Sequence, residues 1–163
     1  SIRRASRRMR LYLIAVGTRM PAWVEDGFAD YAKRLPAHLR PNLIEIAAGR
    51  RTKGADLERI VREEGERVLA ATPADARVIA LERTGRTLST EQVAATLTRA
   101  QQDGNDVAFW IGGPEGLSAA YLQRAHEKWS LSALTLAHPV VRVVWAEQLY
   151  RAYSIQQQLP YHR

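Results

Sequence analysis

The segment VAFWIGGPEGLS, residues 107–118, decides the fold. Its first five residues are all apolar, which is typical of a parallel strand buried on both faces. The run Gly112-Gly113-Pro114-Glu115-Gly116 follows directly, and Ser118 begins a predicted helix. Glycines let the backbone approach a ligand closely, although an ordinary strand-to-helix turn explains them equally well. Because ligands bind beyond the carboxyl ends of parallel strands, this loop is the first candidate site.

The sequence on both sides alternates between strand and helix patterns. We expect further strands at 10–16, 42–46, 77–81 and 131–136, with a flexible basic loop at 47–55 and a polar turn around Gly85. Helices are predicted at 21–35, 56–71, 89–103, 118–126 and 139–157, and Ser89 and Gln92 have the spacing of a capping box. This alternation predicts an α/β fold with a mostly parallel sheet and helices on both faces, in one domain from Met9 to Arg163.

Composition limits the classes of function. Of the 163 residues 46% are hydrophobic, enough for a core, and the chain has no cysteine, which excludes disulfides and thiolate sites. No apolar run approaches the roughly 20 residues that span a membrane. The net charge is +7, and the segment 1–8 contributes four arginines, so we expect a disordered basic arm or a cloning remnant ahead of a natural start at Met9. The remaining mild positive charge permits a nucleic-acid partner.

Common catalytic and nucleotide-binding motifs are missing. The sequence contains no GxGxxG, no GxxxxGK[ST] and no GxSxG, which argues against dinucleotide, P-loop and serine-hydrolase sites. The four histidines never have the HxxxH spacing of a helical zinc site, so no metal is expected. The acidic residues Glu63, Glu64 and Glu66 are interpreted as a solvated helix face.

The C-terminal third holds a second group of candidate residues. Hydroxyl groups at Ser132 and Thr135 are suited to hold a polar ligand group within an otherwise small and apolar segment. The last predicted helix carries Arg142 between valines, and Glu147 and Arg151 at the spacing of an ion pair. The chain ends in PYHR, residues 160–163. These types suit stacking and hydrogen bonding with RNA, whereas composition alone favours a disordered tail.

Several of these blocks, in this order, resemble one family. They are VGT at 16–18 with Trp23, IGGPEGLS at 111–118, LSALTL at 131–136 with His138-Pro139, Arg142, EQLYRA at 147–152, and PYHR at 160–163. Together they resemble the RlmH family of the SPOUT superfamily, which methylates N3 of a pseudouridine in large-subunit ribosomal RNA. The resemblance covers Met9 to Arg163, and no function carries over to residues 1–8.

The resemblance implies a C-terminal trefoil knot, a cytoplasmic homodimer with no membrane partner, and S-adenosylmethionine as methyl donor. It places the donor against Leu81, Gly112, Gly113, Leu131, Ser132, Ala133, Leu134, Thr135 and Leu136. His138 is the expected base or substrate-orienting group, with His162 as its competitor and Arg142 as a further catalytic candidate. Arg142, Arg151, Tyr161, His162 and Arg163 are the expected RNA-binding residues. Because so small a domain offers little surface to recognise a lone RNA stem, an assembled subunit or ribosome is the expected substrate.

Two other functions stay open at this point. One is a SPOUT methyltransferase that acts on transfer RNA, against which the PYHR terminus argues. The other is an RNA-binding or ribosome-assembly factor without catalysis, although a pure binder has no need of an intact glycine loop. A nucleotide-dependent oxidoreductase is disfavoured by the missing dinucleotide motif.

Overall fold

The computed structural model describes residues 8–162, so the predicted basic arm, apart from Arg8, lies outside the described residues. The strands are β1 (Leu11–Val16), β2 (Asn42–Ile46), β3 (Arg77–Thr87), β4 (Val107–Ile111) and β5 (Glu127–Ser130). The α-helices are α2 (Ala22–Ala32), α3 (Leu57–Ala71), α4 (Thr90–Asp103), α5 (Ala119–Leu122) and α6 (His138–Gln156). Two 3-10 helices, η1 (Ala37–Leu39) and η2 (Pro160–His162), complete the described chain.

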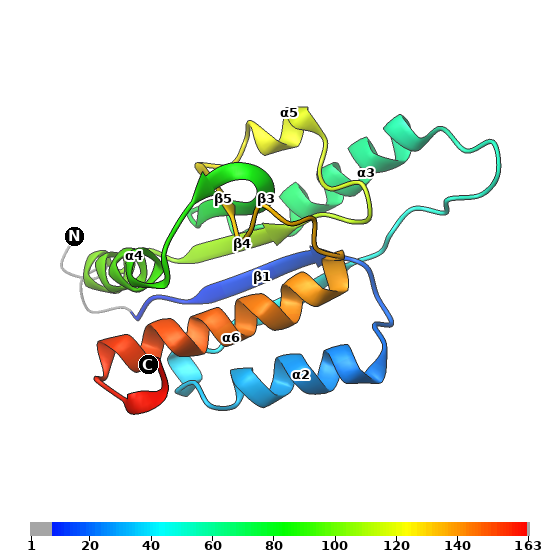
Figure 1. Ribbon diagram of the computed structural model, residues 1–163. Coiled ribbons are helices and arrows are strands. Elements are labelled where there is room, and N and C mark those ends of the chain that lie inside the picture. Colours follow the sequence, from blue (N-terminus) through cyan, green and yellow to red (C-terminus); the bar gives the residue numbers. More distant parts are fainter. Residues whose placement is uncertain (1–7, 163) are drawn as a thin grey trace.

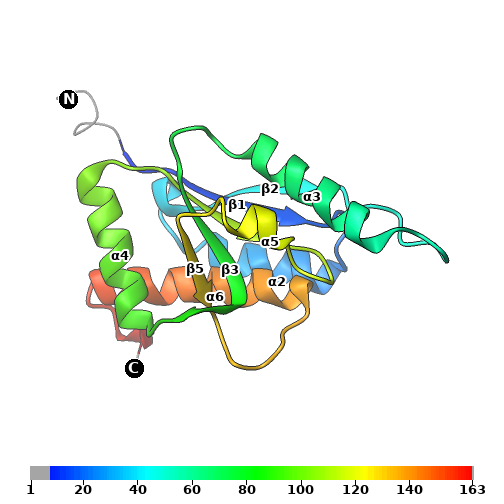
Figure 2. The ribbon, with the colours of Figure 1, turned by 90° about the horizontal axis from the view of Figure 1, so that it is seen from above.

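The five strands form one parallel sheet in the order β2-β1-β4-β3-β5. Figure 1 shows α2 and α6 on one side of β1 and α3 and α5 on the other, and Figure 2 shows α4 beside one end of α6. Helices therefore cover both faces, which confirms the predicted α/β class.

Each face of the sheet has its own hydrophobic core because side chains alternate along a strand. Leu11 and Leu13 of β1 and Phe109 of β4 pack with α4 and α6, whereas Ile14 of β1 and Trp110 of β4 lie in the second core with α3 and α5. On the α6 side the Phe109 and Trp145 rings meet edge to face, with centroids 4.7 Å apart. The uniformly apolar sequences of β1 and β4 follow from this double coverage.

Local capping signals confirm two predicted helix starts. The Asp56 side chain accepts a hydrogen bond from the Arg59 amide at the start of α3. Ser89 and Gln92 form both hydrogen bonds of the predicted capping box at the start of α4.

Several predicted boundaries are wrong, among them the end of α2, which lies at Ala32 and not at residue 35. The fifth strand is not 131–136, which is a loop, but Glu127–Ser130 immediately before it. β3 does not stop at a turn near Gly85; it continues to Thr87 through a bulge, and both of its parts pair with β5. α5 is a single turn, and α6 already begins at His138. Within residues 8–162, no helix is both long and apolar enough to cross a membrane.

Candidate functional site

A cavity of about 770 Å³ lies at the carboxyl edge of the sheet. Its walls are residues 81–83 in the middle of β3, the end of β4 with the loop 112–116, the loop 131–137 and the first turn of α6. The volume falls within the range of about 300–1,000 Å³ that is usual for small-molecule sites. The lining residues are Leu81, Glu82, Arg83, Ile111, Gly112, Gly113, Pro114, Glu115, Gly116, Leu131, Ser132, Leu134, Thr135, Leu136, Ala137, His138, Pro139 and Val141.

Most of the predicted cofactor residues gather in this cavity. Eight of the nine line it, and the ninth, Ala133, is exposed and does not. Glu82 and Arg83 line it as well, and they belong to the part of β3 that sequence analysis assigned to a turn. The predicted convergence at one sheet edge is present in part: the loops 112–116 and 131–137 meet there, but the predicted loop after Leu81 is a continuation of β3, and the strand before the loop 131–137 was misplaced.

The glycine loop 112–116 is a tight turn whose shape excludes side chains. The Gly116 amide donates to the Gly113 carbonyl at 2.9 Å, and Gly116 has φ of 76°. A Cβ on Gly112 would lie 2.4 Å from the carbonyl carbon of Gly116, closer than real Cβ contacts allow. The loop needs glycine at 112 for steric reasons, and this narrow turn forms one wall of the cavity.

The loop after β5 is held by its own hydroxyl groups. Ser130 Oγ donates to the Ser132 carbonyl at 2.9 Å, and Ser132 Oγ accepts from the Leu134 amide at 3.0 Å. Ser132 Oγ thus helps to shape the loop as an acceptor, while its O–H remains able to donate to a polar group in the cavity that Ser132 lines. Leu134 is left 73% exposed at the cavity.

These residues fit the donor that the resemblance implies. Leucine, isoleucine and valine side chains supply an apolar surface for a flat ring, and the glycine backbone supplies hydrogen-bonding groups without side-chain obstruction. In addition, His138 Nδ1 is buried and lacks a hydrogen-bond partner among the described residues. A buried polar atom of this kind costs free energy unless a ligand or water satisfies it. No group of three or more potential metal ligands is found in residues 8–162.

His138 is the first residue of α6 and stands at the cavity. Burial lowers its pKa below the ordinary value of 6.5, and the positive charges of Arg142 and Arg51 lower it further, against the opposing effect of Glu64 and Glu115. The imidazole is therefore neutral near pH 7, the state that can accept a proton.

Arg142 is 2% exposed and joins α6 to the ends of two strands. Its Nη1 donates to Glu45 Oε2 at 2.6 Å, and its Nη2 donates to the Gly17 carbonyl at 2.8 Å. This placement contradicts the predicted contact with RNA phosphate or base oxygens, because the guanidinium is buried and its two terminal nitrogens are engaged. Arg142 instead fixes the N-terminal turns of α6, the helix that carries His138.

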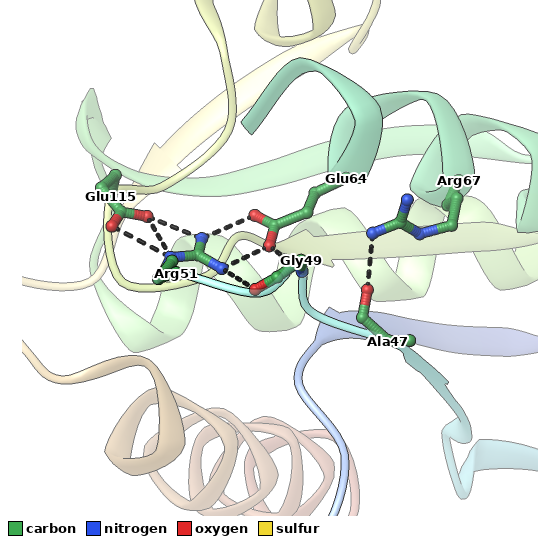
Figure 3. Close-up of polar contacts among 6 residues, drawn as sticks. All are labelled: Ala47, Gly49, Arg51, Glu64, Arg67 and Glu115. Atoms are coloured by element: carbon green, nitrogen blue, oxygen red, sulfur yellow. Dashed lines mark hydrogen bonds and ion pairs between the residues drawn. The ribbon is translucent and has the colours of Figure 1, made fainter. Parts of the chain in front are cut away.

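An ion-pair network that the sequence pattern does not predict lies beside the cavity. Glu64, interpreted as part of a solvated face, is 1% exposed. Arg51 donates to Glu64 with Nη1 and Nη2 at 2.7 and 2.9 Å, and to Glu115 Oε2 with Nη2 at 2.7 Å (Figure 3). These hydrogen bonds raise the pKa of Arg51, and its guanidinium lowers that of Glu115. We call Arg51, Glu64 and Glu115 the Arg51 bridge. The spacing of the acids at 63, 64 and 66 does not predict this network, because Arg51 lies outside the helix that carries Glu64.

The C-terminal residues are ordered through His162, which differs from the disordered tail that composition favoured. Tyr161 Oη donates to Glu147 Oε2 at 2.8 Å, and the Arg151 guanidinium lies 4.9 Å from the centre of the Tyr161 ring. Arg151 also donates to Glu147 at 2.7 Å, which confirms the predicted ion pair. Burial and the bond to Glu147 raise the pKa of Tyr161 to about 12. Arg163 lies outside the described residues.

The two candidate catalytic histidines are not brought together within one chain. His138 begins α6, and His162 follows its far end, where Nδ1 lies 3.4 Å from Ser154 Oγ. From His138 to Ser154, the residue that His162 contacts, α6 rises about 24 Å, so the two side chains lie towards opposite ends of the helix.

Comparison with known proteins agrees with this architecture. Residues 9–162 match the model of a family described as "Predicted SPOUT methyltransferase". A solved structure described as a probable methyltransferase from Bordetella pertussis Tohama I is similar, with a TM-score of 0.56, 16% identity, and coverage of 93% of this chain and 99% of that one. A probable methylase family protein from Haemophilus influenzae Rd KW20 has a TM-score of 0.55 and 14% identity, over 92% of this chain and 69% of that one. At these identities the two structures support the fold alone.

Proposed function

The chain belongs to the SPOUT methyltransferase family, and from this we propose that it transfers the methyl group of S-adenosylmethionine to N3 of a pseudouridine in large-subunit ribosomal RNA. The observation that carries the proposal is the gathering of eight predicted donor-binding residues in one cavity that His138 also lines. The same blocks of sequence, together with PYHR at 160–163, favour this substrate over transfer RNA.

The cavity residues would hold the donor by shape and backbone rather than by charge. Leu81, Leu131 and Leu136 would pack against its adenine, and the glycine loop would supply backbone hydrogen bonds. When bound, the donor supplies a methyl carbon on a positively charged sulfur. The cavity walls would contribute to the rate by positioning the donor, because in-line transfer depends on the relative position of the methyl carbon and the attacking nitrogen.

His138 would remove the proton from N3. Transfer forms an N3–CH3 bond and breaks the S–CH3 bond, so the N3 proton must leave to a base, and S-adenosylhomocysteine is the other product. A neutral imidazole can take this proton. Arg142 would assist indirectly, because it fixes the start of α6 and its charge keeps the pKa of His138 low.

A homodimer explains how His162 could act at the same site. Within one chain it lies beside Ser154, which is about 24 Å from His138 along α6, too far for a shared substrate base. A second subunit that presents its C-terminal end to this cavity would bring Tyr161, His162 and Arg163 to the RNA. The knotted path of the C-terminal segment, like the dimer, is a proposal from the family resemblance.

The test is transfer of labelled methyl from S-adenosylmethionine to intact ribosomes, separated subunits, free ribosomal RNA and transfer RNA. Label at N3 of a pseudouridine in large-subunit RNA, strongest in assembled particles, is the expected result. Label on transfer RNA would replace the proposed substrate, and donor binding without any transfer would favour a non-catalytic RNA-binding factor. A His138→Ala variant that turns over normally would remove His138 from the mechanism.

A further inference from the structure

The loop between β2 and α3, residues 47–56, is anchored by two side chains of α3. Glu64 accepts from the Gly49 amide at 2.8 Å, and Arg67 donates to the Ala47 carbonyl at 2.7 Å (Figure 3). Glu64 and Arg67 are three positions apart and therefore share a helix face. The first half of this loop is thus fixed to α3, in contrast to the flexible loop expected from sequence.

Arg51 extends this anchorage to the cavity wall. It donates to the Gly49 carbonyl and to both oxygens of Glu64 on one side, and to both oxygens of Glu115 on the other. A Cβ on Gly113 would lie 3.3 Å from Arg51 Nη2 and 3.3 Å from Glu64 Oε1. The guanidinium therefore lies directly behind the glycine loop.

The three side chains of the Arg51 bridge differ in burial, and this difference indicates which contact holds which. Glu64 is 1% exposed, Arg51 22% and Glu115 32%. A buried carboxylate must stay paired, so Arg51 is held first by Glu64. The planar guanidinium then offers Glu115 a rigid, two-pronged partner. The less buried end of the bridge is the glycine loop itself, whose position depends on the fixed Arg51.

We infer that Arg51 is a positioning residue for the donor cavity. It holds the glycine loop against α3 in the conformation that binds the donor, and it thereby couples the loop 47–56 to donor binding. The inference rests on the proposed function, because the donor is S-adenosylmethionine. It follows that the coupling runs both ways: if Arg51 stabilises the loop that binds the donor, the donor stabilises the loop that carries Arg51.

The principal variant is Glu115→Gln, which removes the negative charge and one of the two oxygens that accept from Arg51, and leaves the buried Arg51–Glu64 pair intact. The matched control is Arg59→Gln, because Arg59 pairs with Glu63 on the exposed side of the same helix and does not line the cavity. Affinity for S-adenosylmethionine is measured by titration calorimetry. Amide hydrogen exchange of residues 47–56, with and without the donor, measures the reverse coupling independently of activity.

We expect Glu115→Gln to weaken donor binding by about 5–20-fold, within the range usual for coupled sites. The donor should protect residues 47–56 from exchange in the wild type and in Arg59→Gln, and not in Glu115→Gln. The double variant Arg51→Gln/Glu115→Gln should bind no more weakly than Arg51→Gln alone, because both changes break one interaction. Arg51→Lys should restore little of the donor affinity that Arg51→Gln loses, since an ammonium group cannot make the bidentate contacts of a guanidinium.

Unchanged affinity in Glu115→Gln, beside normal wild-type binding, would overturn the inference and leave the proposed function standing. So would additive effects in the double variant, or equal losses in Arg59→Gln. Wild-type protein that binds no S-adenosylmethionine would instead overturn the proposed function, and this inference with it.

Discussion

Replacement of Gly112 by alanine tests whether the narrow turn of the glycine loop holds the donor. The added Cβ would lie 2.4 Å from the carbonyl carbon of Gly116 and 2.6 Å from the amide nitrogen of Leu117. Both are backbone atoms, so no side-chain rotation relieves the contact and the turn itself must move. Overpacking of this kind costs about 1–3 kcal/mol of folding free energy. Because displacement of a positioning group by about 1 Å can lower a rate on the order of 100-fold, which corresponds to about 2.7 kcal/mol, we expect transfer to fall by roughly that factor and donor binding to weaken with it.

The matched control is Gly104→Ala. Gly104 caps the C-terminus of α4 with φ of 71°, just before β4 begins and therefore at the opposite sheet edge. Alanine in this left-handed conformation costs about 1–2 kcal/mol, a loss similar to that of Gly112→Ala. Urea unfolding and calorimetric titration with S-adenosylmethionine are measured on both variants. Wild-type affinity in Gly112→Ala would refute the steric argument, and equal loss of affinity in Gly104→Ala would attribute the effect to destabilisation alone.

Three further predictions concern α6 and the C-terminus. Since burial and nearby arginines lower the pKa of His138, the acid limb of the pH–rate profile should lie below pH 6.5, and transfer should be lost as the pH falls through it. An acid limb above pH 6.5 would exclude His138 as the base. Tyr161→Phe should cost about 1 kcal/mol in urea unfolding, because Glu147 keeps its ion pair, and the wild-type minus variant absorbance titration should show a phenol that ionises near pH 12. Inactive His138→Ala and His162→Ala subunits, when mixed, should regain transfer through dimers with one intact shared site; continued inactivity of mixed dimers would contradict the shared site.

The sequence was a good guide where local chemistry decides structure. β1 and β4 are apolar throughout because both of their faces are covered, and the starts of α3 and α4 follow from their capping side chains. The cavity was predictable because parallel strands place their following loops at one edge. Eight of the nine residues predicted to bind the donor line it for that reason.

The misplaced fifth strand shows what local patterns cannot reveal. β5 has the polar sequence EKWS at the sheet edge, whereas the apolar segment after it is a loop at the cavity. The polar sequence around Gly85 predicts a turn, yet Gly85 lies within β3, and a Cβ there would lie 2.5 Å from the carbonyl carbon of Lys128. A glycine inside a strand can mark the close approach of another backbone, but its partner is some forty residues away and leaves no periodic signal.

The position of β1 in the sheet has a consequence for how the chain folds. β1 lies between β2 and β4 in the sheet. Directly before β1 and β4 begin, the Arg10 amide donates to Asp106 Oδ1, a contact between residues 96 positions apart. Distant pairings of this kind slow folding. A chain that ends before residue 107 keeps one side of β1 unpaired, and unpaired strand edges recruit other chains. A series of C-terminal truncations should therefore aggregate until β4 and then α6 are included, so that folding is completed only after α6 has been synthesised.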